Sequence, residues 1–445
     1  MLGDIASWRE TIELAYRVGR RAYILTFPLV LAELVRRRLS PAGGTARTDS
    51  PDKPLFVMIP AESDCRVWRR PDIQTLTTTT WLDARDEPIA LQVPDAGDRF
   101  VMLQLTSMWG DVVASLGSRL RDDSRLLLLV DPRWDGAHPI GADVVYLAGR
   151  ARLTMSVGIQ PPCGTRELRA ARDWYAACRL APHSRLARAL PPQFDSRAAT
   201  DANMLTSPLD EIRELEPREY FTLACGLLRD VAPAPTDLPV LDDMKQIGLE
   251  PSERLTWQAL SPLVRRGLVY ASNTTLNEIE LAPMPGRIEN GWTVEPDHAG
   301  DDAFQRAVTA FNALTPSPAE DLASMCIGAD DHDRPLRGAA QYRLHFERDN
   351  LPPAKRSWSL TMYDRSGFLV DAPLRRHALR GDAGLVPNDD GSLDLSIQRE
   401  VPHRQRLSNW LPAPPGHFTL QLRLYWPSAD VATGQWRPPP LERVG

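Results

Sequence analysis

A chain of 445 residues, with 43% hydrophobic and 25% charged residues, has the composition of a globular protein and the length for two or three domains. Its formal net charge of −6 argues against non-specific nucleic-acid binding, which requires an excess of Lys and Arg. Only three of the 52 basic residues are lysines, so arginine is the expected anchor for any anionic ligand. The five cysteines are widely spaced and form no Cys-x-x-Cys pair, which disfavours a disulfide framework or structural zinc and favours a cytoplasmic location.

Residues 1–45 are expected to be helical, because apolar residues recur at helical spacing from Ile5 to Tyr23. Within them, residues 20–35 place an apolar run behind two arginines, as a secretion signal does. The run contains Pro28 and Glu33 and is shorter than the roughly 20 residues that span a bilayer. We therefore expect a buried or surface-docked helix and no stable membrane insertion, with a targeting or membrane segment as the alternative.

Residues 46–165 are predicted to form a first β-rich module. The stretches TLTTTTWL, IALQV, RFVMLQL and LLLLVD are rich in β-branched or apolar residues, and turns containing proline separate them. From residue 166 to residue 335 the apolar period changes to that of helices, as in the stripe through Leu260, Val264 and Leu268. This stretch is predicted to be a helical middle segment.

Residues 336–445 return to the two-residue alternation that is typical of half-buried strands. Leu420, Leu422 and Leu424 are predicted to face the core of an antiparallel sandwich, whereas Arg423 and Tyr425 face the other way. The fold class expected for the whole chain is therefore α+β, with two antiparallel β-sandwich-like modules, a helical N-terminus and the helical middle segment.

Several of these stretches carry a family resemblance. LPPAKRSWSLTMYD, NDDGSLDL, SNWLPAPPGHFTLQLRLYWP and the ending GQWRPPPLERV resemble the domain of unknown function numbered 1214. Residues 80–119, together with AYILTFPLVL, resemble its usual partner, numbered 1254. The resemblance implies two sandwich-like modules bridged by helices. It implies no reaction, because the activity of the family is unsettled.

The chain departs from the family pattern at two places. Family members tend to have Asn-Pro and Arg-Tyr where this chain has Ala372-Pro373 and Arg376-His377. They also tend to carry an Asn-x-Asp-Thr-x-Tyr-like stretch where this chain has residues 71–77. Both departures put in doubt whatever roles the replaced Asn and Tyr have in other members.

His377 and Asp83 are the candidate catalytic residues. His377 stands beside Arg376, and a neighbouring cation favours the neutral imidazole, which accepts a proton near neutral pH. Asp83 lies at a strand end of the first β region and could act as a general acid or base if burial raised its pKa. The alternatives are a hydrogen-bonded or surface histidine and a carboxylate that pairs with a charge at a sheet edge.

Five further residues are candidates for ligand binding. Arg376, Arg423 and Tyr425 could line one cleft and hold an acidic ligand, Arg119 ends a turn of the first module, and Trp109 could wall an apolar pocket. The structural alternatives are charge pairing for the arginines and a core position for the tryptophan.

The standard catalytic and cofactor motifs are absent from the sequence, including GxSxG, HExxH, GxxxxGK[ST] and GxGxxG after a strand. Asp330-Asp331-His332-Asp333 is the densest cluster of potential metal ligands, but a solvated turn is the preferred interpretation. Neither a metal nor a cofactor is therefore predicted.

The first functional hypothesis is an enzyme acting on a small, largely apolar metabolite bound between the β modules and the helical middle segment. Without redox or nucleotide motifs, its chemistry would be proton transfer, as in a lyase, isomerase, cyclase or hydrolase. The alternative is a non-catalytic protein that binds a small molecule, or acts as a scaffold, through the same cleft. A metal-dependent enzyme centred on Asp331, His332 and Asp333 ranks third. The protein could also form a homo-oligomer.

Overall fold

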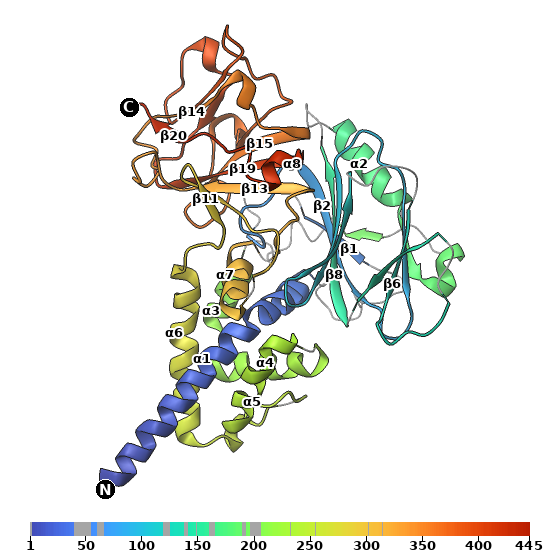
Figure 1. Ribbon diagram of the computed structural model, residues 1–445, viewed down its shortest axis with the longest axis vertical. Helices are drawn as coiled ribbons and strands as arrows, with labels where there is room; N and C mark the ends of the chain where they lie inside the picture. The colour runs from blue at the N-terminus through green and yellow to red at the C-terminus, as the bar shows by residue number, and fades with distance from the viewer. Residues whose placement is uncertain are drawn as a thin grey trace.

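The computed structural model describes residues 2–39, 55–59, 66–118, 125–137, 141–147, 149–159, 165–188, 193–195, 206–231, 233–253, 255–300, 302–313 and 315–445. Three parts meet near the middle of the molecule: a helical part below, a first β module at the right and a second β module above (Figure 1). The α+β fold with several antiparallel sheets is thereby confirmed.

The helical part is built around one long helix. Its helices are α1 (Leu2–Leu39), α3 (Pro208–Glu214), α4 (Pro217–Asp230), α5 (Leu238–Gln246), α6 (Pro262–Leu281) and α7 (Ala303–Ala313). All five later helices contact α1, and α6 makes the most extensive contact with it. A Cβ atom on Gly267 of α6 would lie 2.6 Å from the Cβ of Ala15 in α1, so these two helices can approach so closely only with glycine at this position.

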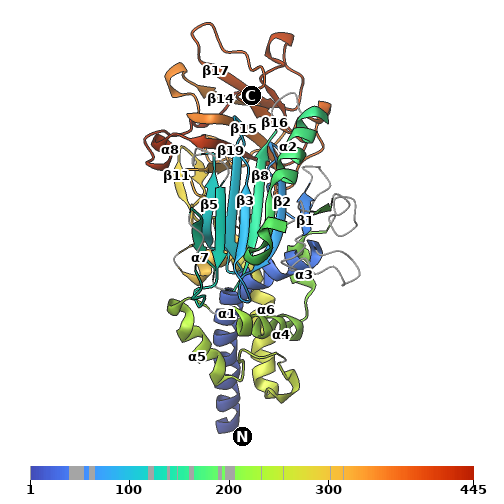
Figure 2. The same ribbon diagram turned by 90° about the vertical axis from the view of Figure 1, so that its right-hand side faces the viewer.

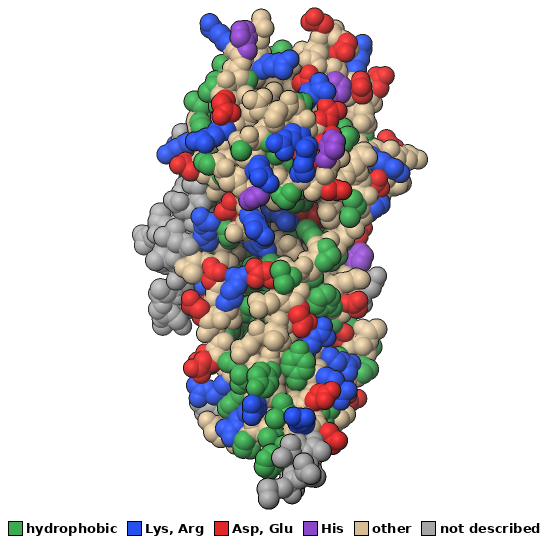
Figure 3. Space-filling view, turned by 90° about the vertical axis from the view of Figure 1, so that its left-hand side faces the viewer, with side chains coloured by type: hydrophobic (Ala, Val, Ile, Leu, Met, Phe, Trp, Pro, Cys, Tyr) green, Lys and Arg blue, Asp and Glu red, His purple; other side chains and the backbone are tan. Residues whose placement is uncertain are grey.

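The apolar run of α1 forms the core of this part. Phe27, Leu29 and Val30 are completely buried, so the expectation of a buried helix is confirmed. Within the ranges given above, no helix combines the length and the hydropathy needed to cross a membrane. Exposed apolar side chains occur on α6, at Val269, Tyr270 and Leu281. The space-filling view of the left-hand side of the molecule shows hydrophobic side chains gathered over its lower half (Figure 3).

The first β module consists of two sheets and one covering helix. Its large sheet has the order β10-β1-β2-β8-β4-β5 and its small sheet the order β7-β6-β3-β9. The bounds are β1 (Leu55–Ile59), β2 (Thr75–Asp83), β3 (Ile89–Val93), β4 (Val101–Ser107), β5 (Val112–Gly117), β6 (Arg125–Val130), β7 (Asp143–Tyr146), β8 (Arg150–Gly158), α2 (Thr165–Ala177), β9 (Arg179–Pro182) and β10 (Gln193–Asp195). The pairs β1–β10 and β6–β7 are parallel, and the other pairs are antiparallel.

The second β module is the C-terminal sandwich. Its large sheet has the order β11-β12-β13-β19-β15-β16 and its small sheet the order β18-β17-β14-β20. The bounds are β11 (Arg287–Glu289), β12 (Trp292–Val294), β13 (Leu322–Ile327), β14 (Tyr342–Phe346), β15 (Ala354–Asp364), β16 (Ala378–Arg380), β17 (Leu393–Gln398), β18 (Trp410–Pro412), β19 (Phe418–Pro427), α8 (Ala429–Ala432) and β20 (Leu441–Arg443). Leu420, Leu422 and Leu424 are completely buried in its core, as predicted.

Both modules extend beyond the segments expected from the sequence. The first takes β9 and β10 from beyond residue 165, and the second takes β11 to β13 from before residue 336. The expected helical middle of 166–335 therefore contributes strands at both of its ends. These strands are three to six residues long, too short for the apolar period to separate them from the helices around them.

The strands of the first module lie between the second module above and the helices below (Figure 2). Within its large sheet, strands β2, β4 and β8 are buried on both faces. One face carries Leu103, Leu153 and Met155 and packs in the core between the two sheets of this module. The opposite face carries polar side chains such as Gln104 and Arg152, which are nonetheless buried. This polar face meets the second module, where Phe100 and Met102 pack against Leu322 and Tyr425, and Gln104 donates a hydrogen bond to the carbonyl of Pro316.

Candidate anion-binding site

A cavity of about 190 Å³ lies where the two modules and the helical part meet. Its walls come from strands β2, β4 and β8 of the first module, strands β13 and β19 of the second, helix α7 and residues 68–72. Neutral polar side chains dominate the lining, namely Thr77, Thr79, Gln104, Thr154, Ser156, Asn312, Thr315, Ser317 and Ser324. Four arginines and two carboxylates complete it, which leaves an excess of two positive charges.

Arg152 is the most isolated of the four arginines. It is the third residue of β8, and 9% of its surface is exposed. Its Nη2 donates to the hydroxyl of Thr315, its guanidinium lies 5.5 Å from the ring centroid of Trp68, and its buried Nε finds no acceptor in the part of the chain that the structure describes. No ion pair with a described carboxylate is formed. Burial lowers the pKa of Arg152 to about 10, which still leaves the guanidinium charged at neutral pH.

Arg69 and Arg70 reach the cavity from a bent segment before β2. Arg69 donates from Nε to the carbonyl of Ser366 at 2.9 Å and lies over the ring of Phe311, while its buried Nη1 has no described acceptor. Burial, reinforced by the charge of Arg70, lowers the pKa of Arg69 to about 10. Arg70 lies 3.5 Å from Glu295 and has a φ of 50°, a left-handed conformation that costs about 1 kcal/mol or more in a residue with a side chain.

Arg423 is held firmly on β19. Nη1 donates to the hydroxyl of Tyr363 at 2.9 Å, and Nη2 donates to the carbonyl of Arg70 at 2.6 Å. Burial alone would lower the pKa of Arg423, but Tyr363, Asp72 and Tyr425 reverse that effect and raise it. This arginine therefore joins the second module to the segment that carries Arg69 and Arg70.

The two carboxylates of the lining are already engaged. Asp72 accepts hydrogen bonds from the backbone of Gln74, from the hydroxyl of Thr75 and, at 2.8 Å, from the hydroxyl of Tyr425. Glu295 accepts from the amide of Gln421 at 2.8 Å in addition to its contact with Arg70. Neither carboxylate pairs with Arg152 or Arg69, so the positive excess is concentrated on those two side chains.

The threonine-rich strand β2 and its neighbours supply hydroxyl donors to the same space. The antiparallel register pairs Thr77 with Ser156 and Thr79 with Thr154, and Thr154 also pairs with Gln104 of β4. The hydroxyls of Thr77 and Ser156 lie 3.2 Å apart. Because side chains alternate between the faces of a strand, one row of hydroxyls and amides faces the cavity from three adjacent strands.

The structure brings only part of the predicted site together. Arg423 lines the cavity, and Tyr425 lies behind its wall, where it fixes Asp72. Arg376 is elsewhere in the second module and donates from Nη1 to the carbonyls of Leu407 and Trp410. It therefore supports a loop and does not share a cavity wall with Arg423.

The two predicted catalytic residues do not line this cavity. His377 is half-buried, and this burial is the main cause of its lowered pKa. The neighbouring cation that lowers the pKa further is Arg375, whereas the sequence suggested Arg376. The sequence makes Asp83 a candidate acid or base only on the condition that burial raises its pKa. Burial does act in that direction, but the hydrogen bonds and charge of Arg85 outweigh it, so the pKa is lowered. Asp83 is an ion-paired carboxylate at the end of β2.

Trp109 and Arg119 complete the predicted ligand-binding set. Trp109 is buried against the helical core together with Trp81 and Met108, which corresponds to the structural alternative considered for it. Arg119 lies outside the described residues.

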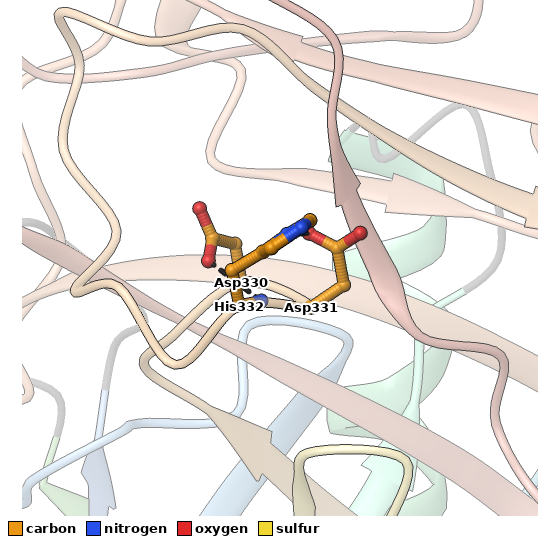
Figure 4. A group of neighbouring side chains, drawn as sticks. All are labelled: Asp330, Asp331 and His332. Atoms are coloured by element: carbon orange, nitrogen blue, oxygen red, sulfur yellow. Dashed lines mark hydrogen bonds and ion pairs between the residues drawn. The ribbon is translucent and has the colours of Figure 1, made fainter.

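The acidic cluster at 330–333 forms a turn (Figure 4). Carboxylate or imidazole atoms of Asp330, Asp331 and His332 lie within 4.8 Å of one another. The carboxylate of Asp330 accepts hydrogen bonds from the backbone N–H groups of His332 and Arg334 and from Nε of Arg334. Its oxygens are thus used by the turn itself.

Sequence reasoning missed Arg69, Arg70 and Arg152. One signal was present: Arg152 is a charged residue in the alternating strand ARLTMSVG, where it shares the polar row with Thr154 and Ser156. A second was the departure from the family pattern at residues 71–77, which falls in the wall of this cavity. Neither signal indicated that residues so far apart in the sequence would meet.

Comparisons with known proteins agree with the architecture. A family model described as protein of unknown function DUF1254 matches residues 56–182, and another described as protein of unknown function DUF1214 matches residues 322–429. None of the curated proteins compared with the chain is significantly similar to it. The crystal structure of the VPA0106 protein from Vibrio parahaemolyticus has a TM-score of 0.65 at 18% sequence identity, covering 97% of this chain and 100% of that chain. An uncharacterized protein from Burkholderia cenocepacia has a TM-score of 0.46 at 13% identity, covering 99% of this chain and 96% of that chain.

The likeness to the Vibrio protein concerns the fold alone. The two family matches fall on the two β modules, in the order that the sequence resemblance predicted. The chain therefore carries a DUF1254 domain toward its N-terminus and a DUF1214 domain toward its C-terminus.

Proposed function

We propose that this protein binds a small organic anion, such as a carboxylate, in the cavity between its two β modules. The observation that carries the proposal is Arg152, a charged side chain that is nine-tenths buried and has neither a carboxylate partner nor an acceptor for its Nε among the described residues. An isolated buried charge is costly unless a counter-charge compensates it. A bound anion would supply that counter-charge, and the planar guanidinium suits a carboxylate.

The dimensions and lining of the cavity limit the ligand. A cavity of about 150 Å³ accommodates benzene, so one of about 190 Å³ takes a molecule of similar or slightly larger size. The row of hydroxyls from Thr77, Thr79 and Ser156 favours a ligand with further oxygen atoms over the largely apolar metabolite expected from the sequence.

Binding without catalysis is better supported than proton-transfer catalysis. No histidine belongs to the described lining, and both of its carboxylates are occupied by hydrogen bonds. His377 and Asp83, the candidate catalytic residues, lie outside the cavity. A cytoplasmic location is part of this proposal and fits Cys178, Cys225 and Cys326, which are free and buried.

The test is calorimetric titration with benzoate and with the neutral analogue benzyl alcohol. We expect benzoate to bind and benzyl alcohol to bind at least about tenfold more weakly, because a charge-assisted hydrogen bond contributes about 1.5–3 kcal/mol. Arg152→Met should remove this difference. Arg150→Met is the matched control, because it removes the same charge from the same strand at a residue that does not line the cavity.

Three outcomes would contradict the proposal: no saturable binding of benzoate, equal binding of the two compounds by the wild-type protein, or an equal loss with Arg150→Met. Incubation of a ligand that binds, followed by NMR of that ligand, separates the binding protein from the enzyme. Return of the ligand unchanged at several pH values supports binding alone.

A further inference from the structure

The charges in the lining of the anion site are not balanced by a ligand with a single negative charge. The charged lining residues are Arg69, Arg70, Arg152, Arg423, Asp72 and Glu295. Glu295 offsets Arg70 at 3.5 Å, and Asp72 is one of the groups whose charge acts on Arg423. A bound monocarboxylate would therefore leave one buried positive charge uncompensated, and such a charge is costly.

Arg152 and Arg69 are the two arginines that remain. Burial alone shifts the pKa of Arg152, with no contribution from a described charge. The carboxylates whose charges act on Arg69 are Glu280 and Asp364. Both lie outside the cavity, and each forms an ion pair with another arginine. Two cations of the lining therefore await a counter-charge from a ligand.

Each of these two guanidinium groups keeps one nitrogen for a ligand. In Arg152, Nη2 donates to Thr315 and Nε is enclosed, whereas Nη1 is not fully buried and has no partner among the described residues. In Arg69, Nε donates to the carbonyl of Ser366 and Nη1 is enclosed, which leaves Nη2. A ligand can therefore pair with both cations without displacing the hydrogen bonds that hold them.

The two guanidinium groups are separate anchors. Arg152 comes from β8 and lies 5.5 Å from the ring centroid of Trp68, whereas Arg69 comes from the segment before β2 and lies 4.8 Å from that of Phe311. Each is fixed by its own ring and its own hydrogen-bond acceptor. Two fixed cations of this kind are best neutralised by two anionic groups on one molecule, one at each anchor.

We infer that the ligand of this site is a short dicarboxylate, with one carboxylate at Arg152 and the other at Arg69. The inference rests on the proposed anion site and narrows its ligand to a molecule with two negative charges. The cavity of about 190 Å³ limits the chain between the two carboxylates to a few carbon atoms. The hydroxyls of Thr77 and Ser156 line the same space and can donate to the remaining carboxylate oxygens.

The test compares succinate with succinamate, in which an uncharged amide of nearly the same shape replaces one carboxylate, by calorimetric titration at neutral pH. We expect succinate to bind about ten- to a hundredfold more tightly, the effect of one charge-assisted pair. Arg69→Met should reduce this ratio to about one, because the second carboxylate then has no cation to pair with. Arg66→Met is the matched control, since it removes a nearby arginine that does not line the cavity, and it should keep the ratio.

Benzoate separates failure of this inference from failure of the anion site. If benzoate binds and Arg152→Met abolishes its binding, but succinate binds no more tightly than succinamate, the dicarboxylate is overturned and the anion site stands. If neither benzoate nor succinate binds, the anion site is overturned as well.

Three further results would overturn the dicarboxylate: a preference for succinate that persists in Arg69→Met, a preference that is lost in Arg66→Met, or tighter binding of inorganic phosphate than of succinate. The last result would indicate a compact anion at a single anchor. Thermal unfolding establishes that each variant is folded. Arg69→Gln, which also removes the charge, replaces Arg69→Met if the latter does not fold, and the comparison on the wild-type protein requires no variant.

Discussion

The central strands β2, β4 and β8 of the large sheet in the first module are buried on both faces, yet the two faces differ in chemistry. The face with Leu103, Leu153 and Met155 is closed by its own module and is mainly apolar, although it also carries the buried hydroxyls of Thr78 and Thr80. The face with Gln104 and Arg152 meets the second module and retains a charge and several donors that the protein does not satisfy. Unpaired hydroxyls occur on the apolar face as well, so what distinguishes the polar face is the buried charge of Arg152, which costs more free energy to bury than a hydroxyl does. The comparison indicates which buried surface is available for a ligand.

The second module repeats the contrast on a single strand. On β19, Leu420, Leu422 and Leu424 are completely buried in the sandwich core, while Arg423 and Tyr425 point from the same strand toward the first module. The polar faces of the two modules therefore face each other. The anion site lies between them because neither module alone covers its polar face.

The largest effect is expected on the apolar face. Leu422→Ala removes a completely buried side chain and should lower the free energy of unfolding by about 2–5 kcal/mol. Urea unfolding followed by circular dichroism measures it, with the exposed Val386→Ala as control. A loss as small as that of the control would mean that the faces of β19 are assigned the wrong way round.

On the polar face, the change in unfolding free energy should have the opposite sign. Arg152→Met replaces an isolated buried charge with an apolar side chain of similar length, so the ligand-free protein should gain about 1–4 kcal/mol of unfolding free energy while it loses benzoate binding. The measurement is urea unfolding in the absence and in the presence of benzoate. A loss of stability in the ligand-free variant would make Arg152 a structural residue and weaken the case for an anion site.

A smaller change in stability should distinguish a buried hydroxyl that has a hydrogen-bond partner from one that has none. Thr106 on β4 is buried and its hydroxyl has no described partner, so Thr106→Val should leave stability unchanged or raise it by up to about 1 kcal/mol. Thr26 of α1 is equally buried, but its hydroxyl donates to the carbonyl of Ala22 and lies 3.3 Å from that of Tyr220. Thr26→Val should cost about 1 kcal/mol. Equal losses for the two variants would indicate that the hydroxyl of Thr106 is satisfied in solution.

Sequence reasoning predicted the fold more fully than the site, for a physical reason. Alternation along β19 depends on neighbouring residues only, so the inward position of Leu420, Leu422 and Leu424 could be read from the chain. The anion site needs Arg69 from the segment before β2, Arg152 from β8 and Arg423 from β19 to meet, and no local period encodes that. Only Arg423 was recognised, because it alternates with those core leucines. The short strands β11 and β12 were missed because three residues are too few to show a two-residue alternation.

The smallest expected effects concern pH, which should change stability but not benzoate affinity, because histidine is absent from the described lining of the anion site. Arginine and a bound carboxylate both stay charged between about pH 6 and pH 8, so benzoate affinity should be constant over that range. Stability should instead respond through histidines of the second module. Burial lowers the pKa of His377 below its ordinary 6.5, so the unfolded chain takes up the proton first and stability should fall as the pH drops below about 6.5.

His345 should act in the opposite direction. Its hydrogen bond to Asp394, at 2.7 Å, raises its pKa, so the stability that it contributes is fully present below about pH 6.5 and is lost as the pH rises through the raised value. Unfolding of the wild type, His377→Gln and His345→Gln between about pH 5 and pH 9 measures both contributions. His377→Gln should remove the loss on the acid side, and His345→Gln should remove the loss on the alkaline side. A change in benzoate affinity with the titration of either histidine would show that a histidine acts on the anion site after all, and it would return His377 to consideration as a catalytic residue.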